Sequence, residues 1–242
     1  MAISLAWNLL EQEAKVRKLA RNAAQINFQN DILYRQWVAG HGGVYVPVSD
    51  QVPPNPYLDV PDRDVMASSG VALTLVNPAY MTRMVNAMAA DAWGSRSHIT
   101  SLKPIRPENR PDPWEEAALQ AFEAGEREVS SLEQMDDGEY VRFMRPFVTE
   151  KACLRCHASQ GYREGDIRGG ISVSVPTAPL RAIQGPIAFR MSVIHLGLWL
   201  AGVVGIVVSR NGLAREIAAR EKVQETLRQS EEHTKASLRE KE

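Results

Sequence analysis

The spacing of hydrophobic and polar positions changes along the chain, and each spacing predicts a kind of element. Apolar residues that recur every three or four positions predict a long N-terminal helix over residues 5–38. Helices are also predicted at 78–93, with Asn77 as cap and Pro78 in the first turn, and at 113–124. Short runs rich in β-branched and aromatic residues predict strands at 43–48, 71–76, 98–102, 127–132, 139–147 and 169–176. This mixture indicates an α+β fold.

A hydrophobic run without formal charge extends from Met191 to Val208. With the apolar residues just before it, the run is long enough to cross a hydrocarbon core of about 30 Å as a helix. A fully buried core helix is the alternative. The polar segment that follows carries Arg210 and Arg215, and positive charge beside a span is typical of the cytoplasmic side. We therefore predict a membrane helix over 186–208, with residues 1–185 outside the bacterial inner membrane.

The segment 209–242 is polar, mixed in charge and helix-favouring, and it predicts a cytoplasmic connector helix with only a loose heptad. Within the predicted span, Gly197, Ala201 and Gly205 share one helix face, where small residues let two membrane helices approach closely. We expect a homodimer through the membrane helix and the connector. The alternative is that glycine and alanine are simply common in membrane helices.

The first ten residues are apolar but too short to span a membrane, and they lack the features of a signal peptide. An external domain followed by an outside-to-inside span needs an export signal. We therefore expect a truncated sequence whose first residues are the outer end of a first membrane helix. The predicted organisation is an N-terminal helix at 1–38, an extracytoplasmic domain at 39–185, the span at 186–208 and the connector at 209–242.

The amino-acid composition excludes several classes of protein. Apolar residues make up 44% of the chain and charged residues 24%, so the chain is not disordered. The net charge of −1 argues against a general nucleic-acid binder, and we expect no nucleic acid as partner. Two cysteines are too few for a disulfide scaffold.

Both cysteines lie in one motif, Cys153-x-x-Cys156-His157. This C-x-x-C-H pattern is the attachment signature of c-type haem. Two thiols three residues apart on a helical turn reach the two vinyl groups of one porphyrin, and the adjacent histidine binds the iron on the proximal side. The alternatives are a zinc site, which needs four ligands and finds no second cysteine pair, and a redox disulfide, which gains nothing from His157. We predict one covalently bound haem c.

The residues alone leave the sixth iron ligand open. Met81 and Met84 lie one turn apart on a predicted helix, where methionine ordinarily fills the core. His41 stands beside two glycines, and His98 begins a predicted strand. A five-coordinate iron that binds a gas is a further alternative. His195, inside the predicted span, is costly there unless it forms an interfacial hydrogen bond or ligates a second, b-type haem.

Six stretches are similar to a known family: DILYRQWVAGHGGVYVPV, PPNPYL, LTLVNPAYMTRM, TSLKPIRPENRPDPWE, YVRFMRPFVTEKACLRCHASQGYREGDIRGGISVSVP and HLGLWLAGVVGI. They extend over roughly residues 25–208 and resemble a bacterial family of haem-c sensor domains that precede PAS and histidine-kinase modules in two-component receptors. A stand-alone cyanobacterial haem-c protein shares the domain. The resemblance implies a PAS-like antiparallel sheet with flanking helices that holds one haem c outside the membrane.

The resemblance also implies residue roles. Cys153 and Cys156 would bind the porphyrin, and His157 would bind the iron. In some relatives the distal ligand is a cysteine on the helix before the TSLK segment. Met81 falls near that position, so we favour Met81 over His41 as the distal ligand. A thioether in place of a thiolate raises the haem potential, because neutral methionine stabilises the ferrous state.

The function implied is a sensor of redox state or of a diatomic gas (NO, CO or O2), with its haem domain in the periplasm and its tail in the cytoplasm. The sensor would act on a histidine-kinase or response-regulator pathway. The chain has no histidine-kinase or ATP-binding motif, so we expect no enzymatic activity from it. The alternative is a membrane-anchored electron-transfer cytochrome. The connector favours the sensor, because a bare anchor needs no such tail.

Overall fold

The computed structural model describes the backbone of residues 2–239 and the side chains of most of them, those of residues 2, 152, 155, 156, 159 and 231–239 excepted. The chain forms two compact units. The sheet unit comprises Glu11–Gln184, and the helical unit comprises the residues up to Leu10 together with those from Gly185 onward. The sheet unit therefore includes most of the N-terminal helix as well as the predicted domain.

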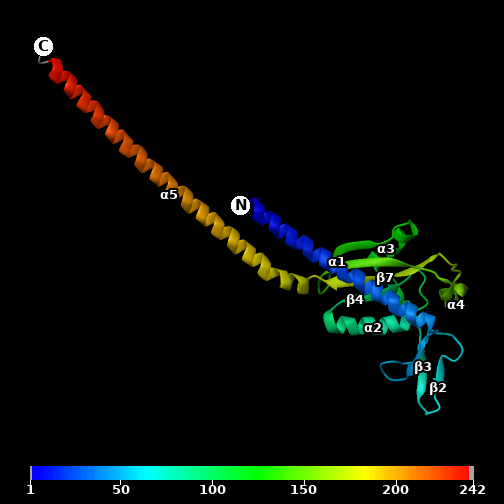
Figure 1. Cartoon of the computed structure of the whole chain (residues 1–242). Coiled ribbons are helices and arrows are strands. Elements are labelled where there is room, and N and C mark those ends of the chain that lie inside the picture. Colours follow the sequence, from blue (N-terminus) through cyan, green and yellow to red (C-terminus); the bar gives the residue numbers. More distant parts are fainter. Residues whose placement is uncertain (1, 240–242) are drawn as a thin grey trace. The chain divides into compact units, whose positions relative to one another are not determined.

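Figure 1 shows the elements in chain order. They are α1 (Ala2–Gly40), β1 (Val44–Pro47), β2 (Asp64–Met66), β3 (Ala72–Val76), α2 (Pro78–Trp93), β4 (Arg96–Thr100), η1 (Pro107–Asn109), α3 (Pro113–Glu123), β5 (Val129–Met135), β6 (Gly138–Val148), η2 (Lys151–Cys153), α4 (Leu154–His157), η3 (Ala158–Gln160), β7 (Ile167–Pro176) and α5 (Ala178–Arg239).

The predicted helices and strands are confirmed at their positions, and one strand was missed. The missed strand, β2, has only three residues and lies in a loop rich in proline and aspartate, so it has no periodicity to detect. Asn77 caps α2 as predicted, since its side chain accepts a hydrogen bond from the Tyr80 backbone N–H at 2.8 Å and Pro78 occupies the first turn.

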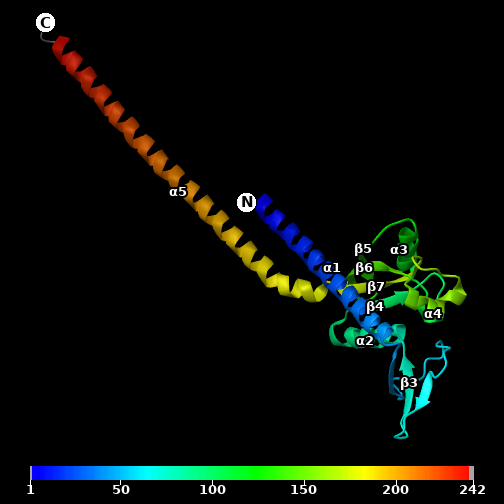
Figure 2. The ribbon, with the colours of Figure 1, turned by 45° about the vertical axis from the view of Figure 1, so that its right-hand side comes forward.

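The strands form two antiparallel sheets. The four-stranded sheet has the order β4-β7-β6-β5, and the three-stranded sheet has the order β1-β3-β2. In both Figure 1 and Figure 2 the three-stranded sheet extends away from the larger one. The antiparallel sheet with flanking helices implied by the resemblance is thus the four-stranded one.

Helices cover both faces of the four-stranded sheet. On one face, Ala20, Ala24 and Phe28 of α1 pack against Phe143 and Val173. On the other face, the core contains Met144 of β6 and three residues of α3, namely Ala118, Leu119 and Phe122. The alternation of side chains along β6 assigns neighbouring residues to opposite faces.

Strand β7 leads almost directly into α5. Only Thr177 separates them, and it is buried. Its N–H donates to the Glu139 carbonyl at 3.0 Å, and its own carbonyl accepts from the Arg181 N–H at 2.9 Å. The Arg181 guanidinium also pairs with Glu13 at 2.9 Å and with Glu139 at 2.6 Å. The junction between strand and helix is therefore fixed by several bonds.

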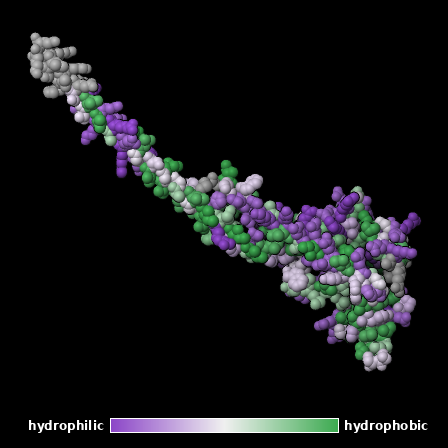
Figure 3. Space-filling view, viewed as in Figure 1, coloured by the Kyte–Doolittle hydropathy of each residue, from purple (hydrophilic) through white to green (hydrophobic). Residues whose placement is uncertain are grey.

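In the helical unit, α5 is one continuous helix through the predicted span and connector, with Pro186 inside it. The stretch Ala178–Ser230 is long and apolar enough to cross a membrane. Its apolar side chains are exposed, and they appear green along α5 in Figure 3. His195 of α5 forms hydrogen bonds to α1 within this unit: its Nε2 lies 3.1 Å from Ser4 Oγ and 3.4 Å from Asn8 Nδ2.

Candidate functional site

The C-x-x-C-H motif lies in the connection from β6 to β7. The connection closes on itself, because the Thr149 N–H donates to the Asp166 carbonyl at 2.8 Å and the Gly165 N–H donates to the Thr149 carbonyl at 2.9 Å. Between these bonds the chain makes three short helical turns, η2, α4 and η3. Cys153 is a free, half-buried thiol at the start of α4. The Cys156 side chain lies outside the described residues.

Hydrogen bonds fix the His157 ring and its tautomer. Gln160 donates from Nε2 to the Lys103 carbonyl at 3.1 Å, which leaves its Oε1 facing His157 Nδ1 at 2.5 Å. Since Oε1 only accepts, Nδ1 carries the proton and Nε2 keeps a lone pair. Burial, followed by the charges of Arg168 and Arg35, lowers the pKa of His157. The ring is therefore a neutral imidazole, the form that ligates a metal.

Two adjoining cavities open onto His157. One, of about 120 Å³, lies between the motif and the loop around Lys103. The other, of about 450 Å³, extends to Cys153 and to the end of α1, and a volume of some 300–1,000 Å³ is usual for cofactor sites. We call the two together the His157 cleft. Six residues line both cavities: Arg35, Asn77, Ala79, Phe147, His157 and Arg168.

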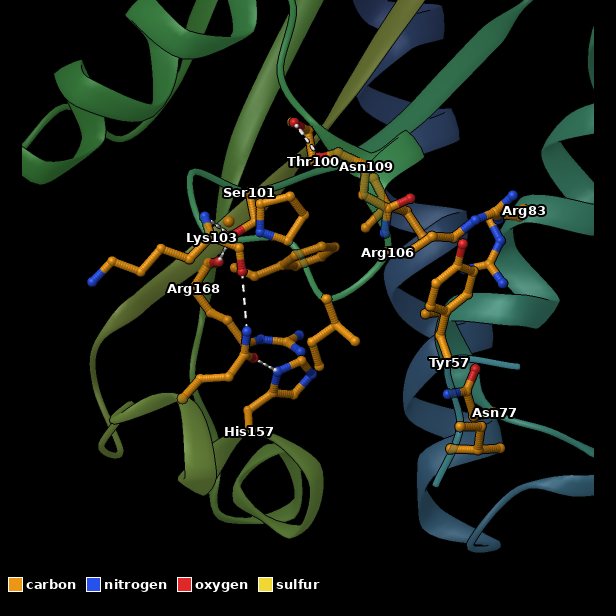
Figure 4. Close-up of a pocket in the computed structure, with 18 of the residues that line it drawn as sticks. Tyr57, Asn77, Arg83, Thr100, Ser101, Lys103, Arg106, Asn109, His157 and Arg168 are labelled. Atoms are coloured by element: carbon orange, nitrogen blue, oxygen red, sulfur yellow. Dashed lines mark hydrogen bonds between the residues drawn. The ribbon is translucent and has the colours of Figure 1, made fainter. Parts of the chain in front are cut away.

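Figure 4 shows the smaller cavity. His157 and Arg168 lie on one side, and Tyr57, Asn77 and Arg83 lie on the other. Several apolar residues complete the walls of the cleft: Ile32, Leu58, Ile99, Pro104, Ile105 and Phe147. The cleft therefore combines apolar surface with many polar side chains, several of them arginines.

Arginines give the cleft a positive charge. Arg35 and Arg168 lie over the Phe147 ring, with Cζ at 4.5 Å and 5.8 Å from its centroid. Burial, together with the charge of Arg168, lowers the pKa of Arg35 to about 10. Burial, together with the charge of Arg106, lowers the pKa of Arg83 to about 10 as well. Such shifts report positive charges that lack full compensation.

The predicted haem fits the residues of this cleft. A planar apolar macrocycle with two carboxylates requires apolar walls and cations, and both are present. Buried arginine atoms without a hydrogen-bond partner, Arg35 Nη1 and Arg168 Nε, leave donors for an anion. No three His, Cys, Asp or Glu side chains gather into a metal-ion site within the described part of the chain. An iron bound by His157 therefore needs a ligand that supplies further donor atoms.

The structure places the distal candidates outside the lining of the cleft. Ala79 and Arg83 line it, and they share one face of α2. Met81 is about 200° around the helix from Ala79, and it is half-buried on another face. Met84 is also half-buried and does not line the cleft.

The histidine candidates have other partners. His41 follows α1, where its Nδ1 lies 2.7 Å from the Trp37 carbonyl. His98 Nδ1 lies 2.9 Å from Glu115 Oε2, and its Nε2 lies 3.0 Å from the Glu108 carbonyl. Both partners of His98 accept, so both ring nitrogens carry protons and the ring is an imidazolium.

His98 belongs to a separate polar cluster against α3. Glu115 is 1% exposed and accepts hydrogen bonds from His98, Ser172 and the Asp112 N–H. Arg142 Nη2 lies 2.7 Å from Asp112 Oδ2 and 3.5 Å from Glu115 Oε1. We call these five residues the Glu115 cluster.

The sequence analysis missed Arg35, Arg168 and Gln160. A signal for Arg35 exists in the sequence. The buried positions of α1 recur at three- and four-residue steps, namely Val16, Ala20, Ala24, Phe28, Asp31 and Val38. Arg35 falls on the same stripe, four residues after Asp31, and a charged residue at a core position is uncommon without a specific partner.

Comparisons with known proteins give a similar solved structure and a matching family model. A crystal structure of the cyanobacterial haem protein Tll0287 is similar to this chain, with 16% identity, a TM-score of 0.43, and coverage of 64% of this chain and 93% of that one. No curated protein matches the sequence. The model of the Tll0287-like family matches residues 11–176. This range includes the whole motif and the residues that line the cleft. The chain belongs to the Tll0287-like family.

Proposed function

We propose that this chain is a membrane-anchored sensor domain with one haem c, attached through Cys153 and Cys156 and bound at the iron by His157. One observation supports this most directly. Cys153 and a neutral His157 line the same cleft, together with buried arginine donors that have no partner in the described structure. The family supports the same assignment, because it includes a protein whose crystal structure is titled a haem protein.

The residues around His157 hold its ring in place. Gln160 is fixed by the Lys103 carbonyl and in turn fixes Nδ1, so Nε2 is free to donate its lone pair. The pinned ends of the motif loop, at Thr149 and Asp166, restrict the movement of Cys153 relative to the sheet. When bound, the haem supplies a redox-active iron and, where one axial position is open, a site for a diatomic gas.

The distal side favours gas sensing. Met81 and His41 stay predictions as distal ligands, and neither lines the cleft. Apart from Cys153 and His157, the described lining contains no methionine, histidine or cysteine. A five-coordinate iron that takes NO, CO or O2 is consistent with this lining.

The route to an output follows the chain. β7 begins next to the cleft with Arg168 and ends one residue before α5. A change in the contacts of Arg168 between two iron states would bias β7 and thereby α5, as signalling requires different contacts in the two states. We propose that α5 crosses the inner membrane, with the sheet unit in the periplasm and the tail in the cytoplasm. A homodimer through Gly197, Ala201 and Gly205 would pass the change to a kinase pathway.

The first experiment tests haem attachment. The full chain, produced in a host that matures c-type cytochromes, is expected to gain about 616 Da, the mass of one haem. The Cys153→Ala/Cys156→Ala variant is expected to lose this covalent addition, and a His195→Leu variant is the control that keeps it. Absence of the added mass from the wild-type chain would contradict the proposal.

The second experiment separates the sensor from the electron carrier. Absorption spectra of the reduced and oxidised protein are recorded with and without CO and NO. A sensor of the proposed kind is expected to change its spectrum on gas binding. An inert low-spin spectrum in both iron states would instead assign the chain to the electron-transfer cytochromes.

A further inference from the structure

Two half-buried arginines of the cleft converge on one aromatic ring from different elements. Arg35 comes from α1 and Arg168 from β7, and their Cζ atoms lie 4.5 Å and 5.8 Å from the Phe147 ring centroid. Arg35 Nη1 and Arg168 Nε are buried without a hydrogen-bond partner. Among the described residues, neither guanidinium forms an ion pair within 4.0 Å. The pair is therefore a concentration of incompletely compensated positive charge.

The nearby carboxylates compensate this pair only in part: the charge of Asp31 acts on Arg35, but no carboxylate lies within ion-pair distance among the described residues. Asp31, one turn before Arg35, accepts from Asn86 at 3.4 Å, and burial raises its pKa to about 6. Glu108 pairs with Arg106 at 2.9 Å, outside the pair. Glu150 lines the larger cavity and forms no ion pair with either arginine among the described contacts. A guanidinium nitrogen that is buried without a hydrogen-bond partner has lost its water, so these two donors are suited to an anionic ligand.

We propose that Arg35 and Arg168 form a carboxylate-binding pair for the two propionate groups of the prosthetic group. This proposal rests on the function proposed above. A guanidinium group matches a carboxylate with two parallel hydrogen bonds, and such charge-assisted bonds are strong in a site that excludes water. Two arginines balance two propionates, and the Phe147 ring offers an apolar surface next to them. A free small-molecule carboxylate has the same chemistry and is distinguished by experiment.

The pair would also connect the cofactor to the rest of the protein. The first residues of α1 belong to the helical unit, and β7 leads through Thr177 to α5, which extends into that unit. Arg35 of α1 and Arg168 of β7 both contact the Phe147 ring. A change in propionate charge or position would therefore act on both elements. This gives the arginines a role beyond cofactor retention.

The test uses the full, matured chain. Arg35→Gln, Arg168→Gln and the double variant are compared with Arg96→Gln. Arg96 is a matched control, because it too lies over an aromatic ring of β6, at 5.1 Å from Tyr140, but it is paired with Asp137. The midpoint potential and the propionate bending band in resonance Raman spectra are recorded. Arginine-to-lysine variants test whether charge alone suffices.

Loss of a positive charge beside the propionates is expected to lower the midpoint potential and shift the propionate band in both single variants, and further in the double variant. The control is expected to show neither change. If haem is attached but the potential and the band stay those of the wild type, the propionate assignment is wrong. If no haem is attached even to the wild-type chain, the proposed function itself fails, which is a separate result.

A second measurement covers variants that fail to fold or mature. The Cys153→Ala/Cys156→Ala chain is titrated with haemin and with haemin dimethyl ester, whose propionates carry no charge. We expect the ester to bind at least about tenfold more weakly, as the loss of charge-assisted bonds predicts. Equal affinity would overturn the proposal. A spectral shift of the wild type on addition of succinate that Arg35→Gln abolishes would assign the pair to a free carboxylate instead.

Discussion

Arginines lie over aromatic rings on both faces of the four-stranded sheet, and two of them, Arg142 and Arg35, differ in what surrounds them. Towards α3, Arg142 lies 4.3 Å over the Trp114 ring and pairs with Asp112 and Glu115. Towards α1, Arg35 lies at a similar distance over Phe147 and has no carboxylate within ion-pair distance in the described structure. Each of these two arginines lies over an aromatic ring, but among the described residues an ion-pair partner is found for Arg142 and not for Arg35.

The presence or absence of a carboxylate partner distinguishes an arginine that stabilises the fold from one that is available to bind a ligand. In the Glu115 cluster every formal charge meets an opposite one, which keeps the cost of burial low and fixes α3 on the sheet. In the His157 cleft, Arg35 and Arg168 form no ion pair within the described residues, as the proposed anion site requires. The following predictions break or sharpen this contrast, beginning with the largest effect.

Removal of the central carboxylate from the Glu115 cluster is expected to have the largest effect. Glu115→Gln leaves Arg142 and the His98 imidazolium with one carboxylate, Asp112, at 45% side-chain exposure. Breaking one partner from a buried pair costs about 4 kcal/mol of unfolding free energy. Urea unfolding of the full chain measures this loss. The matched control is Glu116→Gln, because Glu116 is the exposed neighbour of Glu115. This control is expected to leave the unfolding free energy nearly unchanged. If the two variants lose the same unfolding free energy, the Glu115 charge does not stabilise the fold.

In contrast, neutralising Asp31, the buried carboxyl one turn before Arg35, is expected to stabilise the protein. Asp31 has its pKa raised from 3.8 to about 6 by burial. Its folded form therefore prefers the proton, so stability is full below about pH 4 and falls as the pH rises through about 6. The shift corresponds to at most about 3 kcal/mol at neutral pH.

Asp31→Asn is thus expected to raise the unfolding free energy at about pH 8 and to have little effect at about pH 4. Denaturant unfolding at the two pH values checks the sign, with Asp91→Asn, at an exposed position of α2, as control. Destabilisation at the higher pH would mean that Asp31 is needed as a counter-charge for Arg35.

The smallest loss of stability is expected when the His98 side chain is replaced. Burial alone would lower its pKa, but the hydrogen bond and charge of Glu115 raise it above 6.5. The stabilisation is complete below the ordinary histidine pKa and is lost as the pH rises through the raised value. Its side chain is 38% exposed, so solvent weakens the interaction.

Melting temperatures at about pH 5.5 and about pH 9 measure this contribution. The difference between wild type and His98→Gln is expected to be larger at the lower pH. His41→Gln, which loses only a bond to a backbone carbonyl, is expected to give no such pH dependence. A pH-independent difference for His98 would show that its proton is not held by Glu115.

The sequence predicted most of the fold because local signals were strong. Asn77 and Pro78 mark the start of α2, and a run of β-branched residues marks β7. β2 was missed because three residues in a polar loop become a strand only through pairing with β3. The separation of the strands into two sheets likewise depends on pairing between distant segments, which periodicity does not encode.

The site was predictable only in part. The motif itself identified Cys153 and His157, since spacing and residue type determine that chemistry. The lining of the cleft depends on how six separate segments meet, so Gln160 and Arg168 have no signal of their own in the sequence. Met81 was favoured from its place along the chain, whereas the direction of a side chain depends on the rotation of its helix about the axis.

The position of β7 inside the sheet limits how it can move. It is hydrogen-bonded to β4 on one side and to β6 on the other. Sliding β7 by one residue would break both ladders and turn its core side chains to the wrong face. A displacement of the paired part of β7 would therefore have to carry β4 and β6 with it, and the start of α5 would tilt with three strands instead of following one isolated segment.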